Sequence, residues 1–416
     1  MSRPPRSNIR RLAVGRLISV TGGAAAYTAL MFSVWNTTHS AAWQSGTLLL
    51  TFGVVGILGP FTGHLGDRFD RRKVMIWAEV VAAVFFAAMA FVDAPAILVP
   101  LAFASAVAES PFYSASAAAI PALAQREEDV AWANSLLGIG RNAGIMVGPM
   151  IGGVLVAVVG PIHGPNVVFG LNALTFLVSV LLTVSVRARF SQDRSAAEAA
   201  EHAGITAGIR FLWNERVLRR MTLAWLVVLL GAGMAMVADA PLAASFGVGA
   251  VGFGALIACW GGGSVLGSVL ARKLTARTEP LWLVLGAAGI ALGHLGVGLA
   301  PLFSMVLVFG LIMGTSDGVT IVAETGIMQR RTPDAVRSRV MAAFEAALSL
   351  GLAVAYVFAG PVLKLVGPQR VYLLGGVAAT VATLVLLPLR HLSKAAVEPD
   401  ADRVNGPAVT AAAQPE

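Results

Sequence analysis

The chain has 416 residues, of which 57% are hydrophobic and only 12% are charged. Soluble domains carry about 25% charged residues, so a chain this apolar belongs in a membrane rather than in water. The formal net charge is +8, but the basic residues lie in small clusters without interleaved aromatic residues, which argues against a nucleic-acid-binding domain. The single cysteine, Cys259, excludes an intramolecular disulfide and any metal or redox site built from cysteines.

Clusters of charge divide the chain into apolar intervals of about 50 residues. Each interval can hold two helical spans of about 20 residues and a short turn, so the sequence predicts twelve transmembrane helices. Continuous apolar runs of this length are typical of helices rather than of barrel strands. In chain order we expect the spans at residues 12–35, 44–65, 74–93, 96–122, 132–158, 166–186, 219–244, 250–271, 281–299, 302–327, 338–363 and 371–389.

The stretch 187–218 is more polar and predicts a cytoplasmic linker between two six-helix halves, residues 1–186 and 219–391. Apolar residues at helical spacing in this linker predict a short amphipathic helix on the inner membrane surface. These apolar residues are Ile205, Ile209, Leu212 and Trp213. Residues 392–416 are poor in large apolar side chains, and we expect them to form a disordered cytoplasmic tail.

The basic residues also predict the orientation of the chain. If all the charge clusters face one side, that side holds all but four of the 30 Lys and Arg residues. The positive-inside rule then places both termini in the cytoplasm, with the protein in the cytoplasmic membrane. A faint internal repeat relates residues 125–153 to 330–363, because each has a charged turn leading into a helix with a Gly-Pro pair. The expected fold is all-α, with twelve transmembrane helices in two pseudo-symmetric halves.

Acidic residues inside the predicted spans are costly in a membrane and are functional by default. Glu109 is midway along the fourth helix, and Asp317 and Glu324 lie on the tenth. Asp239 lies toward the outer end of the seventh helix. We interpret these four as candidates for proton coupling, because a titratable group in a cavity can bind a proton from one side and release it on the other. Glu79 and Glu345 also fall in spans, and for these two and for Asp239 a structural role is the stronger alternative.

Other polar and aromatic residues in the spans are candidates for the substrate cavity. For Glu109 and Asp317 the alternative to a coupling role is structural pairing with Arg16, Arg141 or neighbouring hydroxyls. Arg141 could instead hold an anionic substrate or extend toward the inner interface. The residues we expect to line the cavity are Arg16, Tyr27, Tyr113, Arg141 and Trp225.

After the second predicted helix the chain reads GHLGDRFDRR. This stretch resembles the hallmark motif of the major facilitator superfamily, Gly-x-Leu-x-Asp-Arg-x-x-Arg-Arg. The matching residues are Gly63, Leu65, Asp67, Arg68, Arg71 and Arg72, while Asp70 replaces the usual glycine. The resemblance implies a conformational latch, in which Asp67 contacts the start of the eleventh helix when the inner side is closed. We expect Thr332 to cap that helix, with Pro333 at its first position.

The fifth predicted helix contains GIMVGPMIGG. It resembles the Gly-x-x-x-Gly-Pro-x-x-Gly-Gly motif of exporters in the same superfamily, at Gly144, Gly148, Pro149, Gly152 and Gly153. Small residues permit close helix packing. The central AGIRFLWNERVLRRM resembles the branch that contains macrolide-efflux and enterobactin-exporter proteins. The fourth helix lacks the arginine that many drug–proton antiporters carry, so we do not transfer an arginine-based coupling mechanism.

These features predict a secondary transporter working by alternating access, not an enzyme. The first expectation is export of a small amphipathic, drug-like molecule by proton antiport, with a role in multidrug resistance. The alternatives are a dedicated exporter of a siderophore or other metabolite, and a lysophospholipid or lipid flippase. The expected partners are a small-molecule substrate, protons and the lipid bilayer, with no nucleic acid. We expect a monomer and no cofactor or metal.

Overall fold

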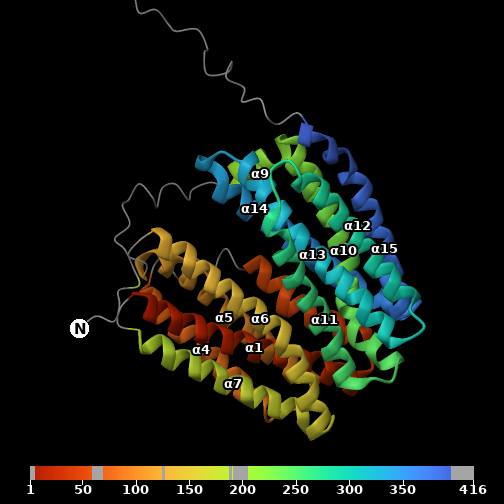
Figure 1. The fold of residues 1–416 in the computed structure, drawn as a ribbon. Helices are drawn as coiled ribbons and strands as arrows, with labels where there is room; N and C mark the ends of the chain where they lie inside the picture. Colours follow the sequence, from red (N-terminus) through yellow and green to blue (C-terminus); the bar gives the residue numbers. More distant parts are fainter. Residues whose placement is uncertain (1–4, 59–68, 124–126, 187–189, 191–204, 395–416) are drawn as a thin grey trace, which may run out of the picture.

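A computed structural model of the chain describes residues 5–58, 69–123, 127–186, 190 and 205–394. The regular elements in these residues are all helical, and they form two groups (Figure 1). The N-terminal group consists of α1 (Pro5–Thr38), α2 (Ala41–Leu48) with the π-helix η1 (Leu49–Val54), α4 (Arg71–Met89), α5 (Pro95–Leu123), α6 (Glu127–Val159) and α7 (His163–Val184).

The C-terminal group follows a short helix, α9 (Ile205–Asn214). Leu212 of α9 is buried in the core of this group, while Trp213 stays half-exposed. The helices of the group are α10 (Arg216–Ser245), α11 (Gly249–Leu270) with η2 (Ala271–Lys273), α12 (Glu279–Leu299), α13 (Phe303–Arg331), α14 (Asp334–Val366) and α15 (Pro368–Leu386) with η3 (Leu387–Lys394).

Eleven helices in the described residues are long and apolar enough to cross a membrane. The remaining helix of the N-terminal group, α4, begins with Arg71, Arg72 and Lys73 and contains Glu79, which lowers its mean hydropathy. It packs between α5 and α7 like a spanning helix. With α4 included, each group has six helices, as the sequence predicts.

Several helices extend past the expected spans because their polar ends are stabilised. Helix α6 begins at Glu127, and near this end Arg6 of α1 donates to Asp129 at 3.0 Å. Helix α14 begins at Asp334, so Pro333 occupies the cap position. The expectation that Thr332 caps this helix is wrong by one residue, because the buried hydroxyl of Thr332 has no hydrogen-bond partner among the described residues.

The two groups contact each other mainly through two pairs of elements, α6 with α11 and α2–η1 with α14, with smaller contacts of α1 with α10 and α11 and of α2 with α10. In the first pair, a Cβ on Gly153 would lie 2.5 Å from the carbonyl oxygen of Ala250. In the second, the hydroxyl of Ser45 donates to the carbonyl oxygen of Tyr356 at 2.6 Å. These contacts lie away from the N terminus and α9, toward which the two groups diverge (Figure 1). We call the end where they meet the joined end and the other the open end.

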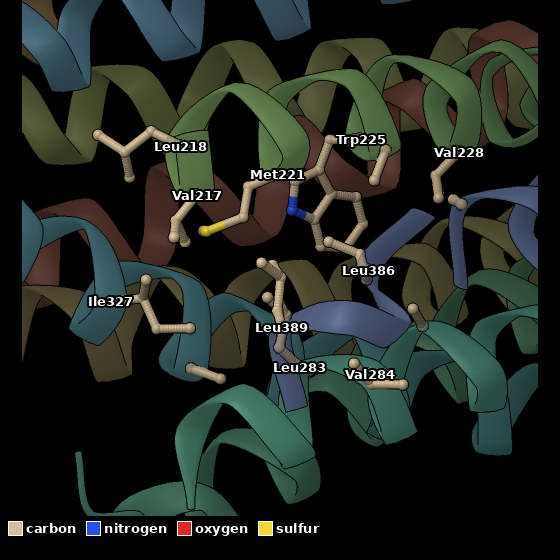
Figure 2. Packing of buried hydrophobic residues seen from close by; sticks show 14 of the residues in the cluster. Val217, Leu218, Met221, Trp225, Val228, Leu283, Val284, Ile327, Leu386 and Leu389 are labelled. Carbon is tan, nitrogen blue, oxygen red and sulfur yellow. The ribbon is translucent and has the colours of Figure 1, made fainter. Parts of the chain in front are cut away.

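The core of the C-terminal group is apolar and continuous. Figure 2 shows Trp225 of α10 within it, beside Val228 and Met221 of the same helix and Leu386 of α15. The side chain of Trp225 is 7% exposed. Trp225 is therefore a packing residue of this group in the described state, although the sequence placed it among the candidates for the substrate cavity.

Candidate functional site

The N-terminal group holds a charged cluster at mid-height. Arg16 of α1 is buried, and its Nη1 lies 3.4 Å from Oε1 of Glu109 on α5. The hydroxyl of Tyr113 donates to the same carboxylate oxygen at 3.2 Å. The guanidinium also lies over the rings of Tyr113 and Phe112, at 4.4 and 5.0 Å from their centroids. The structural ion pair that the sequence offered as an alternative role for Glu109 is thus present, with Arg16 rather than Arg141.

A second carboxyl adjoins this cluster. Glu79 of α4 is fully buried, and Oγ of Ser179 on α7 donates to its Oε1 at 2.6 Å. Glu79 is close enough to Arg16 and Glu109 to interact with both. The sequence favours a structural role for Glu79 but does not predict this contact. Two carboxyls therefore lie near one guanidinium that pairs with only one of them, an arrangement that can hold a proton as well as the ion pair.

Arg141 is exposed and makes no ion pair with a residue in the described part of the chain. It stays a predicted candidate for holding a negative charge in the cavity.

Three acids of the C-terminal group lie close together. Asp317 and Glu324 are seven residues apart on α13 and so share one face, and Glu345 lies on α14. Ser264 of α11 donates to Oδ2 of Asp317 at 3.3 Å. Glu324 is near Asp317, Glu345 and the indole of Trp225, whose N–H has no hydrogen-bond partner among the described residues. No basic side chain in the described ranges forms an ion pair with these acids.

Asp239 is separate from both clusters. It lies near the joined end of α10, where the hydroxyl of Tyr372 on α15 donates to its Oδ1. Tyr27 of α1, expected in the cavity, is close to Asp239 instead, and its ring meets that of Phe52 at a centroid distance of 5.5 Å. The sequence did not single out Tyr372. The signal that could have identified Tyr372 is that tyrosine is rare in this apolar chain, which has only four.

The latch residues Gly63, Asp67 and Arg68 lie outside the described residues, so their predicted role stays a prediction. Arg71 and Arg72 are described, and both anchor the start of α4. Arg71 donates to the carbonyl oxygen of Phe190 at 3.3 Å, and Arg72 donates to the carbonyl oxygen of Val184 at the end of α7.

The glycines of the export-type motif are packing positions. Gly144, Gly148 and Gly152 face α1, where a Cβ would meet backbone atoms between Thr21 and Ala25. Gly153 instead faces α11 of the other group. Pro149 lies inside α6 and its carbonyl oxygen approaches Gly254 of α11. The motif therefore holds α1, α6 and α11 at backbone contact, close to the joined end.

These clusters suit binding and proton transfer rather than covalent catalysis. The described residues contain no group of three or more side chains that could hold a metal ion. Acids and arginines inside the spanning helices of two six-helix groups are typical of a membrane transporter of small solutes.

The sequence matches the model of the Major Facilitator Superfamily over residues 12–281 and 229–412, and the chain belongs to this superfamily. The enterobactin exporter EntS of Escherichia coli K12 is 25% identical over 395 residues, covering 92% of each chain. The putative bacilysin exporter BacE of Bacillus subtilis 168 is 22% identical, covering 85% of this chain and 88% of that protein.

Solved structures share the fold. A POT family transporter aligns with a TM-score of 0.74 at 11% identity, covering 92% of this chain and 96% of its own. A bacterial homologue of ferroportin in an inward-facing state gives a TM-score of 0.69 at 15% identity, covering 93% and 100%. The predicted superfamily, the twelve-helix fold and the class of function, a multi-pass membrane transporter rather than an enzyme, are confirmed.

Proposed function

We propose that the chain exports a small amphipathic molecule across the cytoplasmic membrane by alternating access, in exchange for protons. The observation that carries the proposal is a charged cluster inside the spanning helices of each group. Arg16, Glu109 and Tyr113 form the cluster of the N-terminal group, and Asp317 and Glu324 belong to that of the C-terminal group. The likeness to two proteins named as exporters supports export rather than import.

The described conformation corresponds to the inward-open state in this proposal. The groups meet at one end and diverge at the end that carries the N terminus and α9. That end holds most of the basic clusters, so the positive-inside rule assigns it to the cytoplasm. Substrate would enter from the cytoplasm, and separation of the joined end would release it outside.

Proton coupling is proposed for the acids inside the spanning helices. Asp317 and Glu324 have no basic partner among the described residues, so a proton can bind either without breaking an ion pair. Glu109 differs, because its proton would compete with Arg16. A cationic or hydrogen-bonding group of the substrate can displace the proton from the same carboxyl, which is the exchange that antiport requires.

The experiment pairs a deletion strain with a strain that expresses the Asp317→Asn variant. Both are profiled for sensitivity to a panel of toxic compounds, and their culture media are compared by mass spectrometry. Sensitisation to several unrelated amphipathic compounds supports export of drug-like molecules. An unchanged sensitivity profile together with unchanged media would contradict the proposed function.

A second candidate is the dedicated export of one self-made metabolite. The observation that favours it is that both named relatives are described as exporters of single natural products. The same experiment separates the two candidates. Loss of one compound from the medium, without sensitisation to the panel, identifies the dedicated exporter.

A further inference from the structure

A groove lies between α11 and α12 on the surface of the C-terminal group. Both helices pack on α13, which forms the floor of the groove. The walls come from the end of α11 with η2 and from the first turns of α12, and the volume is about 340 Å³. The other elements packed on α12 are α15 and η3 of the same group, so the groove lies away from the contact with the N-terminal group.

The rim of the groove is apolar and exposed. Leu270 of α11 and Trp282 and Leu285 of α12 line it, and all three belong to the exposed large apolar side chains of the protein. On helices that cross a membrane such side chains contact lipid. Tryptophan is enriched at the level of the lipid headgroups, and Trp282 lies in the first turn of α12. The groove therefore opens to the bilayer just below the headgroups.

The floor of the groove suits an apolar occupant. The hydroxyls of Thr315 and Ser316 donate to carbonyl oxygens one turn earlier in α13, both at 2.8 Å, so neither donor is free for a ligand. Leu274 and Val319 add further apolar lining. An apolar cavity of about 150 Å³ can hold a benzene ring. The groove is larger than that and has room for a segment of an acyl chain.

The turn between α11 and α12, residues 271–278, carries three cations and no acid. Arg272, Lys273 and Arg277 are exposed, and within the described ranges none of them forms an ion pair. The next acid along the chain, Glu279, is buried and paired with Arg330. Positive charge without a counter-charge, beside an apolar groove, is complementary to a ligand with an anionic head and an apolar chain.

The corresponding turn of the N-terminal group differs in charge. Both turns follow the second helix of their group, and both have an arginine five residues after a glycine, Arg68 in the first and Arg272 in the second. Asp67 precedes the first arginine, whereas Ala271, which lines the groove, precedes the second. The turn of the C-terminal group therefore lacks the acid that would repel an anionic head.

We propose that this groove binds one anionic phospholipid, with an acyl chain between α11 and α12 and the phosphate at Arg272, Lys273 and Arg277. Long basic side chains reach the headgroup level while their stems stay on apolar surface. The positive-inside rule assigns this turn to the cytoplasmic side, where the leaflet carries anionic lipids. The lipid fills space that the side chains of α11 and α12 leave open. The inference requires neither export nor proton exchange.

The test measures lipid binding through the fluorescence of Trp282. The full chain in detergent micelles is titrated with phosphatidylglycerol or with phosphatidylcholine, both with the same brominated acyl chains, which quench a tryptophan on contact. Trp282→Phe is titrated in parallel, and the difference between the two curves reports Trp282 alone. A basic residue near the headgroups strengthens binding about fivefold, so phosphatidylglycerol should quench Trp282 at a concentration lower by about tenfold or more.

Two triple variants with the same loss of charge locate the headgroup. The first replaces the cations of the turn and combines Arg272→Gln, Lys273→Gln and Arg277→Gln. It should move the phosphatidylglycerol curve to that of phosphatidylcholine. The matched control replaces three exposed arginines of α9 and α10 and combines Arg210→Gln, Arg216→Gln and Arg219→Gln. It should leave both curves unchanged.

A pair of variants on α13 locates the acyl chain. Thr315→Phe puts a large side chain on the floor of the groove and should abolish the quenching of Trp282 by either lipid. Thr325→Phe makes the same change farther along the helix, outside the groove, and should leave the quenching as in the parent.

The outcomes separate this inference from the proposed function. Equal curves for the two lipids, or equal shifts in the two triple variants, would overturn it, because binding would then depend on no particular cations. Unchanged quenching in Thr315→Phe would place the chain outside the groove and would also overturn it. If Thr315→Phe fails to fold, the triple variants decide. The measurement involves no transport, so its failure leaves the proposed export untouched, and a chain that exports nothing leaves the lipid site standing.

Discussion

Arg16 of α1 and Glu109 of α5 form an ion pair of 3.4 Å inside the N-terminal helix group, 93 residues apart in the sequence. Both side chains are largely withdrawn from solvent, with 8% and 21% of their surface exposed. Asp317 of the C-terminal group has only the hydroxyl of Ser264 as a described partner. Removal of the Glu109 carboxylate should therefore affect stability differently from removal of the Asp317 carboxylate, although both acids are proposed to take part in coupling.

Glu109→Gln should lower thermal stability in detergent, whereas Asp317→Asn should not. A buried pair that loses one partner leaves an uncompensated charge, which costs about 3–5 kcal/mol. A double variant, Arg16→Met with Glu109→Gln, removes that charge and should recover much of the loss. Equal stability of Glu109→Gln and the parent would show that the pair contributes nothing to the fold.

The single variants Glu109→Gln and Asp317→Asn should each also abolish the proton movement that substrate drives. Purified protein in vesicles is supplied with a substrate identified by the deletion strain, and the internal pH is followed with a trapped dye. Substrate binding should persist, because each change removes a charge and keeps the shape of the side chain. If both variants move protons with the parent's stoichiometry, these two acids are structural and coupling occurs elsewhere.

Gly153→Ala should weaken the contact between the groups at the joined end. The added Cβ would lie 2.5 Å from the carbonyl oxygen of Ala250, and overpacking of this kind costs about 1–3 kcal/mol. Gly138→Ala is the matched control, because no atom lies within 4 Å of its Cβ position on the same helix. Spin labels at His163→Cys and Pro301→Cys should report a longer distance for Gly153→Ala only. Identical distributions for the two variants would contradict the assigned contact.

The sequence predicts the spans well because membrane thickness and charge placement constrain them directly. Contacts between spans depend on tertiary packing and are much harder to predict. The bond between Tyr372 and Asp239 joins α15 to α10, 133 residues away, and no spacing rule relates them. The sequence alone does not distinguish a cavity role from a core role for Trp225, because that depends on its neighbours on α12 and α15. The pattern of apolar residues also does not predict the π-helical turn in η1.

The orientation can be tested by accessibility of single cysteines. In a Cys259→Ser background, cysteines at His163 and Ser245 should react with an impermeant thiol reagent from outside intact cells. Ala276→Cys lies in the turn at the open end and should react only after the cells are permeabilised. All three positions are exposed, so access decides the result. The opposite pattern of labelling would reverse the proposed orientation.

The latch prediction concerns Asp67, which lies before α4 and outside the described residues. A carboxylate near the start of α14 would favour the inward-closed state, because a helix N-terminus attracts negative charge by about 0.3–1 kcal/mol. Asp67→Asn should therefore raise the ratio of inward-open to inward-closed protein about two- to fivefold. Spin labels at Lys73→Cys and Ala276→Cys measure this at the open end. An unchanged distribution with normal transport would make Asp67 an ordinary surface charge.

The two helix groups are proposed to open alternately at opposite ends of the molecule. Two distances measured in the same protein test this most directly. One is measured between His163→Cys and Pro301→Cys at the joined end, and the other between Lys73→Cys and Ala276→Cys at the open end. When pH or the Gly153→Ala change shifts the populations, one distance should lengthen as the other shortens. Distances that lengthen together, or a joined end that never separates, would contradict alternating access.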